Sequence, residues 1–185
     1  MWDTPSASRW EDLRVSDWGP SVYGEPCREC EFAWTIPVPE AIALVANLPI
    51  SFSGLLEGRA GTERHPELDW SVTGYVLHVA DNLRIWAERL MGVLGGAPLL
   101  VGNYDENKLA DARSYREIPP QAAMWSLARS VDDWLRAVEA APVSDVVMIH
   151  PVRGELVLSD VVLSNAHDGL HHQWDIERTL VHLGQ

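Results

Sequence analysis

The sequence predicts an all-α protein built as a four-helix bundle, with an irregular N-terminal extension and a short hairpin before the last helix. Apolar residues recur at helical spacing in four long runs, and proline, glycine or polar connectors separate these runs. A chain of 185 residues with 46% hydrophobic composition can bury the core of one such domain. We therefore divide the chain into an extension, residues 1–37, and a bundle, residues 38–185.

The extension carries tryptophans but no sustained period. Trp2, Trp10, Trp18 and Trp34 occur among prolines and glycines. Aromatic residues in this setting suit either an ordered arm that packs through its rings or a loop that is ordered only in part. Periodicity does not choose between the two.

The first two helices are predicted over residues 39–58 and 70–94. Pro49 removes a backbone donor from the first helix, so we expect a kink or an interruption there. Asp69 and Ser71 are suitable caps for the start of the second helix. Six apolar residues of the second helix share one face: Val72, Tyr75, Val79, Trp86, Leu90 and Val93.

The second half of the chain contains a connector, a helix, a hairpin and a final helix. Residues 99–118 are expected to be a long connector. The third helix is predicted to begin at Pro119 and Pro120, since proline suits the first turn of a helix. Residues 143–157 are predicted to form two short extended pieces around a turn, and the last helix covers residues 157–184.

The middle of the last helix holds four residues of types that bind metals: His167, Asp168, His171 and His172. Residues four apart share a helix face, so these form two overlapping pairs, His167/His171 and Asp168/His172. At about 100° per residue, the second pair flanks the apolar stripe that faces the core, and the first pair points almost the opposite way. The Asp168/His172 pair is therefore half of a predicted metal site. The alternative is that both residues merely cap a groove.

A third ligand is predicted to come from His78, at the edge of the apolar face of the second helix. A lone helical histidine is commonly structural, but an additional Asp-x-x-x-His pair favours a ligand role. Two imidazoles and one carboxylate, with room for water or substrate, form the donor set of catalytic zinc and of facial-triad iron sites. Asp81, Asn82 and Asp175 are within helical reach as acceptors for the ligand imidazoles.

These residues resemble the ligand pattern of the DinB superfamily of YfiT-like metal-dependent proteins, which includes the mycothiol-dependent maleylpyruvate isomerase. In that family, one histidine lies early in the second helix. An acidic residue or histidine, three spacers and a histidine lie on the last helix. The matching residues here are His78, Asp168 and His172, and the last is followed by Gln173 and later by a Leu-Gly pair. The resemblance covers about residues 38–185.

The resemblance implies a bundle of DinB/YfiT-like type that holds a divalent metal, zinc first, with nickel or iron as alternatives. It also implies a small-molecule substrate. The reaction is either transfer or isomerisation that depends on a low-molecular-weight thiol, or metal-dependent hydrolysis. The carboxylate at Asp168 resembles the isomerase branch. The other function class left open is a non-catalytic metal-binding or stress-related interaction module, and no catalytic residue is assigned.

The composition restricts the partners. A net charge of −13 argues against a surface for nucleic acid or for anionic lipid. The N-terminus lacks the apolar core of a signal peptide. The longest apolar runs, such as Val93–Val101, contain glycine and proline and are too short to span a bilayer. We expect a cytoplasmic protein that binds neither nucleic acid nor membranes.

Two cysteines form a single C-x-x-C motif, Cys27 and Cys30, which is weak evidence by itself. The commonest reading is a pair of reduced thiols in a turn. A structural metal site would need two more ligands, for which His65 or His150 are the candidates. A disulfide or a redox role is the third possibility, although a stable disulfide is disfavoured in the cytosol.

The last helix carries a second apolar stripe: Leu163, Leu170, Trp174 and Val181. A helix in a four-helix bundle normally buries only one face, so this stripe needs a further cover. Either the tryptophan-rich extension folds back over it or a second subunit packs there. We favour a homodimer, the commonest arrangement of soluble oligomers.

Overall fold

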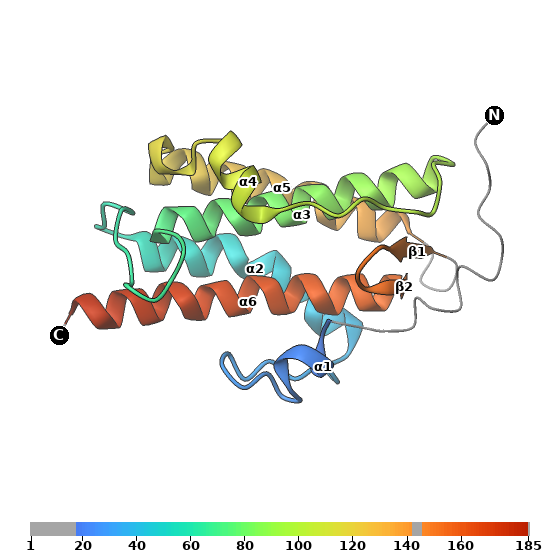
Figure 1. Cartoon of the computed structure of the whole chain (residues 1–185), viewed down its shortest axis with the longest axis horizontal. Helices are drawn as coiled ribbons and strands as arrows, with labels where there is room; N and C mark the ends of the chain where they lie inside the picture. The colour runs from blue at the N-terminus through green and yellow to red at the C-terminus, as the bar shows by residue number, and fades with distance from the viewer. Residues whose placement is uncertain (1–17, 142–145, 185) are drawn as a thin grey trace.

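The structure is a computed structural model that describes residues 18–141 and 146–184. It is mostly helical, with one two-stranded antiparallel sheet (Figure 1). The elements, in chain order, are α1 (Pro20–Tyr23), α2 (Val38–Leu56), α3 (Val72–Leu94), α4 (Glu106–Ala112), η3 (Tyr115–Glu117), α5 (Pro120–Ala140), β1 (Val147–His150), β2 (Gly154–Val157) and α6 (Leu158–Leu183).

Four long helices, α2, α3, α5 and α6, form the bundle, which confirms the predicted fold class. The helix α3 packs against α5 and α6, and α2 packs against the same two helices. Helices α2 and α3, which follow one another in the chain, therefore share both neighbours. The predicted hairpin is confirmed by β1 and β2, which pair antiparallel between α5 and α6.

The bundle core is built from the apolar stripes that the sequence predicts. Phe52, Trp86, Trp134 and Ile176, one from each long helix, are each 1% exposed or less. The indole Nε1 of Trp134 donates a hydrogen bond of 2.7 Å to Oδ1 of Asn165, so a buried polar contact joins α5 to α6. Large aromatic side chains with their polar atoms satisfied fix the spacing of the helices.

Close packing of α6 on α2 depends on Gly169. A Cβ atom added there would lie 2.5 Å from Cδ1 of Leu48, a side chain that is only 2% exposed. The glycine therefore lets the middle of α6, where the candidate ligands lie, approach α2 closely.

The helix α2 is continuous through Pro49, so the predicted interruption is wrong. One proline removes a single helical hydrogen bond, and five buried residues on both sides of it hold the helix to the core: Ala41, Val45, Leu48, Phe52 and Leu56. By length and composition alone, α2 also meets the requirement for a membrane span, with a mean hydropathy of 1.4. The expectation that every apolar run is too short is wrong for this segment, because the helix does not stop at Pro49.

The connector between α3 and α5 is more ordered than the sequence pattern indicated. It contains α4 and the short 3-10 helix η3. Asp105 caps α4, since its Oδ1 accepts a 3.0 Å hydrogen bond from the backbone N–H of Lys108. Residues 99–101 also run beside β1, where the N–H of Val101 donates to the carbonyl of Ile149 at 3.0 Å. Its two short helices, α4 and η3, pack against α3.

The described part of the extension, residues 18–37, lies along α6 on the side away from α3 (Figure 1); we call it the N-terminal segment. Trp2 and Trp10 lie outside the described residues. The ring of Trp34 lies 4.5 Å from the ring of His167, and Tyr23 lies at the same distance. The segment therefore covers the part of α6 that carries His167.

Candidate metal centre

Three predicted ligands come together between α3 and α6. The Nε2 atom of His78 lies 3.5 Å from Oδ1 of Asp168, and Nε2 of His172 lies 3.6 Å from the same oxygen. One donor atom from each residue lies within 4.8 Å of the other two. The helical phase of α6 brings Asp168 and His172 to the side that faces α3, where His78 meets them.

The geometry of this triad fits a shared divalent ion better than a hydrogen-bonded cluster. Separations of 3.5 and 3.6 Å exceed the ordinary length of an N–H···O hydrogen bond, about 2.7–3.2 Å. They match the edge of a tetrahedron around an ion with bonds of about 2.1 Å, which is about 3.4 Å. Two imidazoles and one carboxylate support a divalent metal here.

Neighbouring side chains hold two of the ligands in place. The Oδ2 atom of Asp168 accepts a 2.9 Å hydrogen bond from Asn82, which leaves Oδ1 directed at both imidazoles. The Nδ1 atom of His172 lies 2.9 Å from Oδ2 of Asp175. This contact leaves Nε2 of His172 for an ion, as is usual for ligand histidines. Asn82 is itself held by Tyr104, whose hydroxyl donates to Oδ1 at 3.2 Å.

The electrostatics of the triad follow from its burial and its charges. Burial lowers the pKa of His172, but the hydrogen bond to Asp175 and the charge of Asp168 outweigh it, so the pKa is raised. Burial raises the pKa of Asp168, but the interactions with His78 and His172 outweigh it, so the net shift is downward. The indole of Trp70 stacks on His78, with ring centroids 4.7 Å apart, and shields that edge of the site from water.

Asp81, the third proposed acceptor, has another role. Its Oδ2 atom accepts a hydrogen bond from the hydroxyl of Tyr115, and its Oδ1 atom pairs with Arg113 and Arg84. The expectation that Asp81 orients a ligand is therefore wrong. Asp81 precedes Asn82, which contacts Asp168, by one residue. Because successive residues of a helix are about 100° apart, the carboxylate of Asp81 faces the connector and not the triad.

Replacement of Asp175 by asparagine should weaken metal binding at the triad by about tenfold, and replacement by alanine by up to about 100-fold. The reason is that asparagine keeps an acceptor oxygen near Nδ1 of His172 but loses the charge, whereas alanine loses both. Metal dissociation constants, measured by competition with a chelator, check this expectation. Glu177→Gln removes a charge from the same helix outside the site and is the matched control. Equal affinities for Asp175→Asn, Asp175→Ala and the control would exclude Asp175 from the site.

The triad opens on a cavity of about 310 Å³. Its walls come from the N-terminal segment, α3, the connector, the hairpin and α6. Besides the triad they include Tyr23, Trp70, Tyr75, Asn82, Trp86, Arg89, Tyr104, Glu106, His150 and Arg153. A space of this size accommodates a small organic molecule beside the ion.

His150, which precedes the turn of the hairpin, lines this cavity and is only 4% exposed. Its Nδ1 atom accepts hydrogen bonds of 3.2 Å from the backbone N–H groups of Val152 and Arg153, so the neutral ring carries its proton on Nε2. Burial, with the charges of Arg153 and Arg89, lowers the pKa of His150 to about 4. The side chain is therefore a neutral donor at the cavity wall.

Two guanidinium groups face the same cavity. Arg89 stacks over Trp86, with Cζ 4.4 Å from the ring centroid, and Arg153 donates a 2.8 Å hydrogen bond to the hydroxyl of Ser164. Neither has a carboxylate partner within the described part of the chain. These two cations are the candidate anion-binding groups of a cavity whose wall also carries the carboxylates of Asp69, Glu106 and Asp168.

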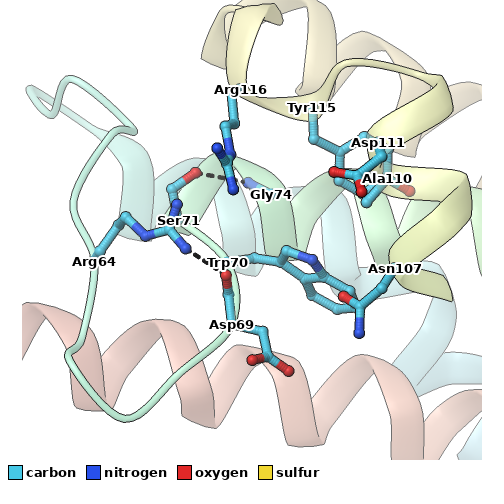
Figure 2. A pocket seen from close by; sticks show the side chains of 10 residues that line it. All are labelled: Arg64, Asp69, Trp70, Ser71, Gly74, Asn107, Ala110, Asp111, Tyr115 and Arg116. Carbon is cyan, nitrogen blue, oxygen red and sulfur yellow. Dashed lines mark hydrogen bonds between the residues drawn. The ribbon is translucent and has the colours of Figure 1, made fainter.

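A second cavity, of about 260 Å³, shares Asp69 and Trp70 with the first (Figure 2). Arg64, Asp111, Tyr115 and Arg116 are among the residues that line it. No group of three metal-binding residues lies in this cavity within residues 18–141 and 146–184. The candidate metal ligands His78, Asp168 and His172 therefore belong to the first cavity.

The C-x-x-C motif acquires different partners from those expected. Cys27 and Cys30 are both free thiols and lie beside His167 and His171 of α6. The proposed partners are wrong: the ring of His65 packs on His182, 4.7 Å away, and His150 lines the first cavity. Local sequence could not reveal the true partners, because Cys27 and His171 are 144 residues apart.

Comparison with known proteins supports the fold. No family model matches the sequence, and no curated protein matches it. Among solved structures, the chain is similar to YfiT from Bacillus subtilis, with a TM-score of 0.70 and 17% sequence identity over 80% of this chain and 87% of that one. That protein is described as a probable metal-dependent hydrolase with an unusual four-helix bundle topology. The YfiT-like fold predicted from the sequence is thereby confirmed.

Proposed function

We propose that this YfiT-like bundle is a zinc-dependent enzyme that acts on a small, carboxylate-bearing molecule. The observation that carries the proposal is the coincidence of His78, Asp168 and His172 with Arg89 and Arg153 around one cavity. A structural metal site is normally closed by four protein ligands, whereas three ligands beside a cavity leave a position for substrate. This difference favours an enzyme over a non-catalytic binding module.

A bound divalent ion would supply a Lewis acid for a carbonyl or leaving group and would lower the pKa of a water molecule or thiol. The side chains of the cavity would bind and orient the substrate and limit the access of water. Arg89 and Arg153 bind the carboxylate of the substrate, and Trp86 forms an apolar wall between them. His150 is a neutral hydrogen-bond donor, since burial lowers its pKa to about 4, whereas the hydroxyl of Tyr104, whose pKa burial raises, donates to Asn82 and has an oxygen that can accept from the substrate. Trp70 and Tyr75 limit access of bulk water to the ligands.

Hydrolysis is the first candidate reaction, and the description of YfiT is in line with it. Transfer or isomerisation that uses a low-molecular-weight thiol is the second. Neither described cysteine lines the cavity, so a thiol reaction needs a thiol that enters from solution. Turnover of carboxylated esters and amides by the zinc-loaded protein, with and without added thiols, separates the two. Turnover that requires the thiol favours transfer, and turnover by water alone favours hydrolysis.

The double substitution Arg89→Gln with Arg153→Gln should weaken the binding of a small dicarboxylate such as succinate by about 100-fold or more. Each charge-assisted hydrogen bond contributes about 1.5–3 kcal/mol when it is well formed. Calorimetric titration of the zinc-loaded protein with succinate measures the effect. Arg129→Gln, at an exposed arginine that pairs with Asp132, is the matched control and should bind like the parent. Equal affinities for all three proteins would exclude an anion site in the cavity.

We also propose a cytoplasmic location and a homodimer. Two free cysteines suit a reducing compartment. Val181 is 62% exposed near the end of α6, and Trp174 is half-buried, so part of the second stripe remains available to a second subunit. Leu163 and Leu170 instead pack against the core, which leaves a smaller apolar surface than the sequence pattern indicated.

A further inference from the structure

We propose that Cys27, Cys30, His167 and His171 form a second zinc site, structural in kind, that fastens the N-terminal segment to α6. One donor atom from each of the four residues lies within 4.8 Å of the others. Two thiolates and two imidazoles are the donor set of structural zinc, which is closed by four protein ligands. The site is separate from the triad and takes nothing from it, because the two sites use different residues of α6.

The turn that holds the cysteines is arranged to present both sulfur atoms on one side. The backbone N–H of Cys27 donates to the carbonyl of Phe32 at 2.9 Å, and its carbonyl accepts from the N–H of Glu31 at 3.0 Å. Glu31 has a φ angle of 59°, the left-handed conformation that tightens the turn. Such turns are the usual framework of C-x-x-C ligand pairs.

His171 is oriented as a ligand by contacts at both of its nitrogens. Its Nδ1 atom lies 3.8 Å from Sγ of Cys27, and its Nε2 atom lies 3.3 Å from Oε2 of Glu29. A tetrahedral site with bonds of about 2.3 Å to sulfur and about 2.0 Å to nitrogen has an S–N edge of about 3.5 Å. The carboxylate of Glu29 fixes the proton on Nε2, so the lone pair of Nδ1 faces the cysteines.

His167 provides an independent indication of a missing partner. The side chain is only 5% exposed, and its Nε2 atom has no hydrogen-bond partner among the described residues. Three aromatic rings, those of Tyr23, Phe32 and Trp34, surround the imidazole with centroids 4.5 to 5.6 Å away. An unpaired polar atom in such an apolar pocket is costly. A metal bond to this ring would remove the cost.

The site has a consequence for the first cavity. Tyr23 belongs to the segment that the cysteines anchor, and its ring packs on His167 and also lines the cavity of the triad. Zinc at the second site would therefore hold one wall of the first cavity in place. The N-terminal segment has only one short helix, α1, so it needs such a fastening more than the bundle does.

Metal content and the spectrum of the cobalt-substituted full chain test the proposal. The purified parent should carry two zinc equivalents per chain. Its Co²⁺ form should show the near-ultraviolet absorption of cobalt–thiolate charge transfer, and this measurement requires no variant that might fail to fold. Cys27→Ser and Cys30→Ser should each lose one equivalent and that absorption. His78→Ala should lose the other equivalent and keep the absorption. His182→Ala, on α6 outside both sites, is the control and should behave like the parent.

Three outcomes would overturn the second site. They are a cobalt form without thiolate absorption, cysteine variants with the zinc content of the parent, and a parent chain whose mass is lower by two hydrogens because of a disulfide. Failure of the proposed enzyme site gives a different result. In that case the parent carries one equivalent, with thiolate absorption, that His78→Ala does not change.

Discussion

His172→Ala and His78→Ala should each weaken divalent-metal binding at the cavity by more than about 100-fold. Loss of a side chain that only orients a ligand costs about 10- to 100-fold, so direct loss of a ligand should cost more. Both imidazoles face the same oxygen of Asp168, at 3.5 and 3.6 Å, so each substitution leaves only two donors. Competition with a chromophoric chelator measures the affinity. Any activity found on carboxylated substrates should fall with the metal.

His171→Ala is the matched control for this prediction, because it removes an imidazole from the adjacent position of α6. It should leave the cavity metal in place and remove only the metal that is bound by the cysteines. Cobalt spectra distinguish the two, since only the second site contains thiolates. If His171→Ala lost the cavity metal while His172→Ala retained it, the assignment of helix faces would be wrong by one residue.

Asp81→Ala should reduce the free energy of unfolding by about 1–3 kcal/mol, because it leaves the buried hydroxyl of Tyr115 without its acceptor and two half-exposed guanidinium groups without their carboxylate. Asp81 is 2% exposed and receives contacts from Tyr115, Arg113 and Arg84. These contacts tie η3 and the end of α4 to α3. Their loss should therefore also loosen the connector, which carries Tyr104.

Urea unfolding of the parent and of Asp81→Ala at the same metal load measures this effect. Asp132→Ala is the control: Asp132 pairs with Arg129 on the surface of α5, both side chains are more than half exposed, and such pairs contribute about 0–1 kcal/mol. Equal losses for the two alanine variants would show that the Asp81 contacts do not stabilise the connector.

Periodicity was sufficient to predict the bundle and the faces of its helices. The stripe that contains Trp86 in α3 is buried, and α6 presents Asp168 and His172 to α3 as its phase required. A helical period depends only on the local sequence, so these features do not require knowledge of which segments meet. The same reasoning correctly placed His167 and His171 on the other side of the helix.

The errors arose where distant segments meet. Periodicity shows that His167 faces away from the core but not that a turn more than 130 residues earlier covers it, so the partners of the cysteines were wrong. Asp81 was considered as an acceptor for the ligand imidazoles because it is within helical reach of them, although it contacts Tyr115 and Arg113 of the connector. Pro49 was expected to kink or interrupt α2, but it does not interrupt the helix, because core residues on both sides of it maintain it. In each case a tertiary contact outweighed a local rule.

The interleaving of two ligand pairs in α6 has an evolutionary consequence. His167 and His171 serve one proposed ion, and Asp168 and His172 serve the other, one residue further along. Point substitutions can therefore remove either pair separately, whereas the gain or loss of a single residue between positions 167 and 172 disrupts both. In homologous chains that lack the two cysteines, positions 167 and 171 should vary freely while positions 168 and 172 do not. Homologous chains that lack the two cysteines should thus also tend to lack His167 and His171.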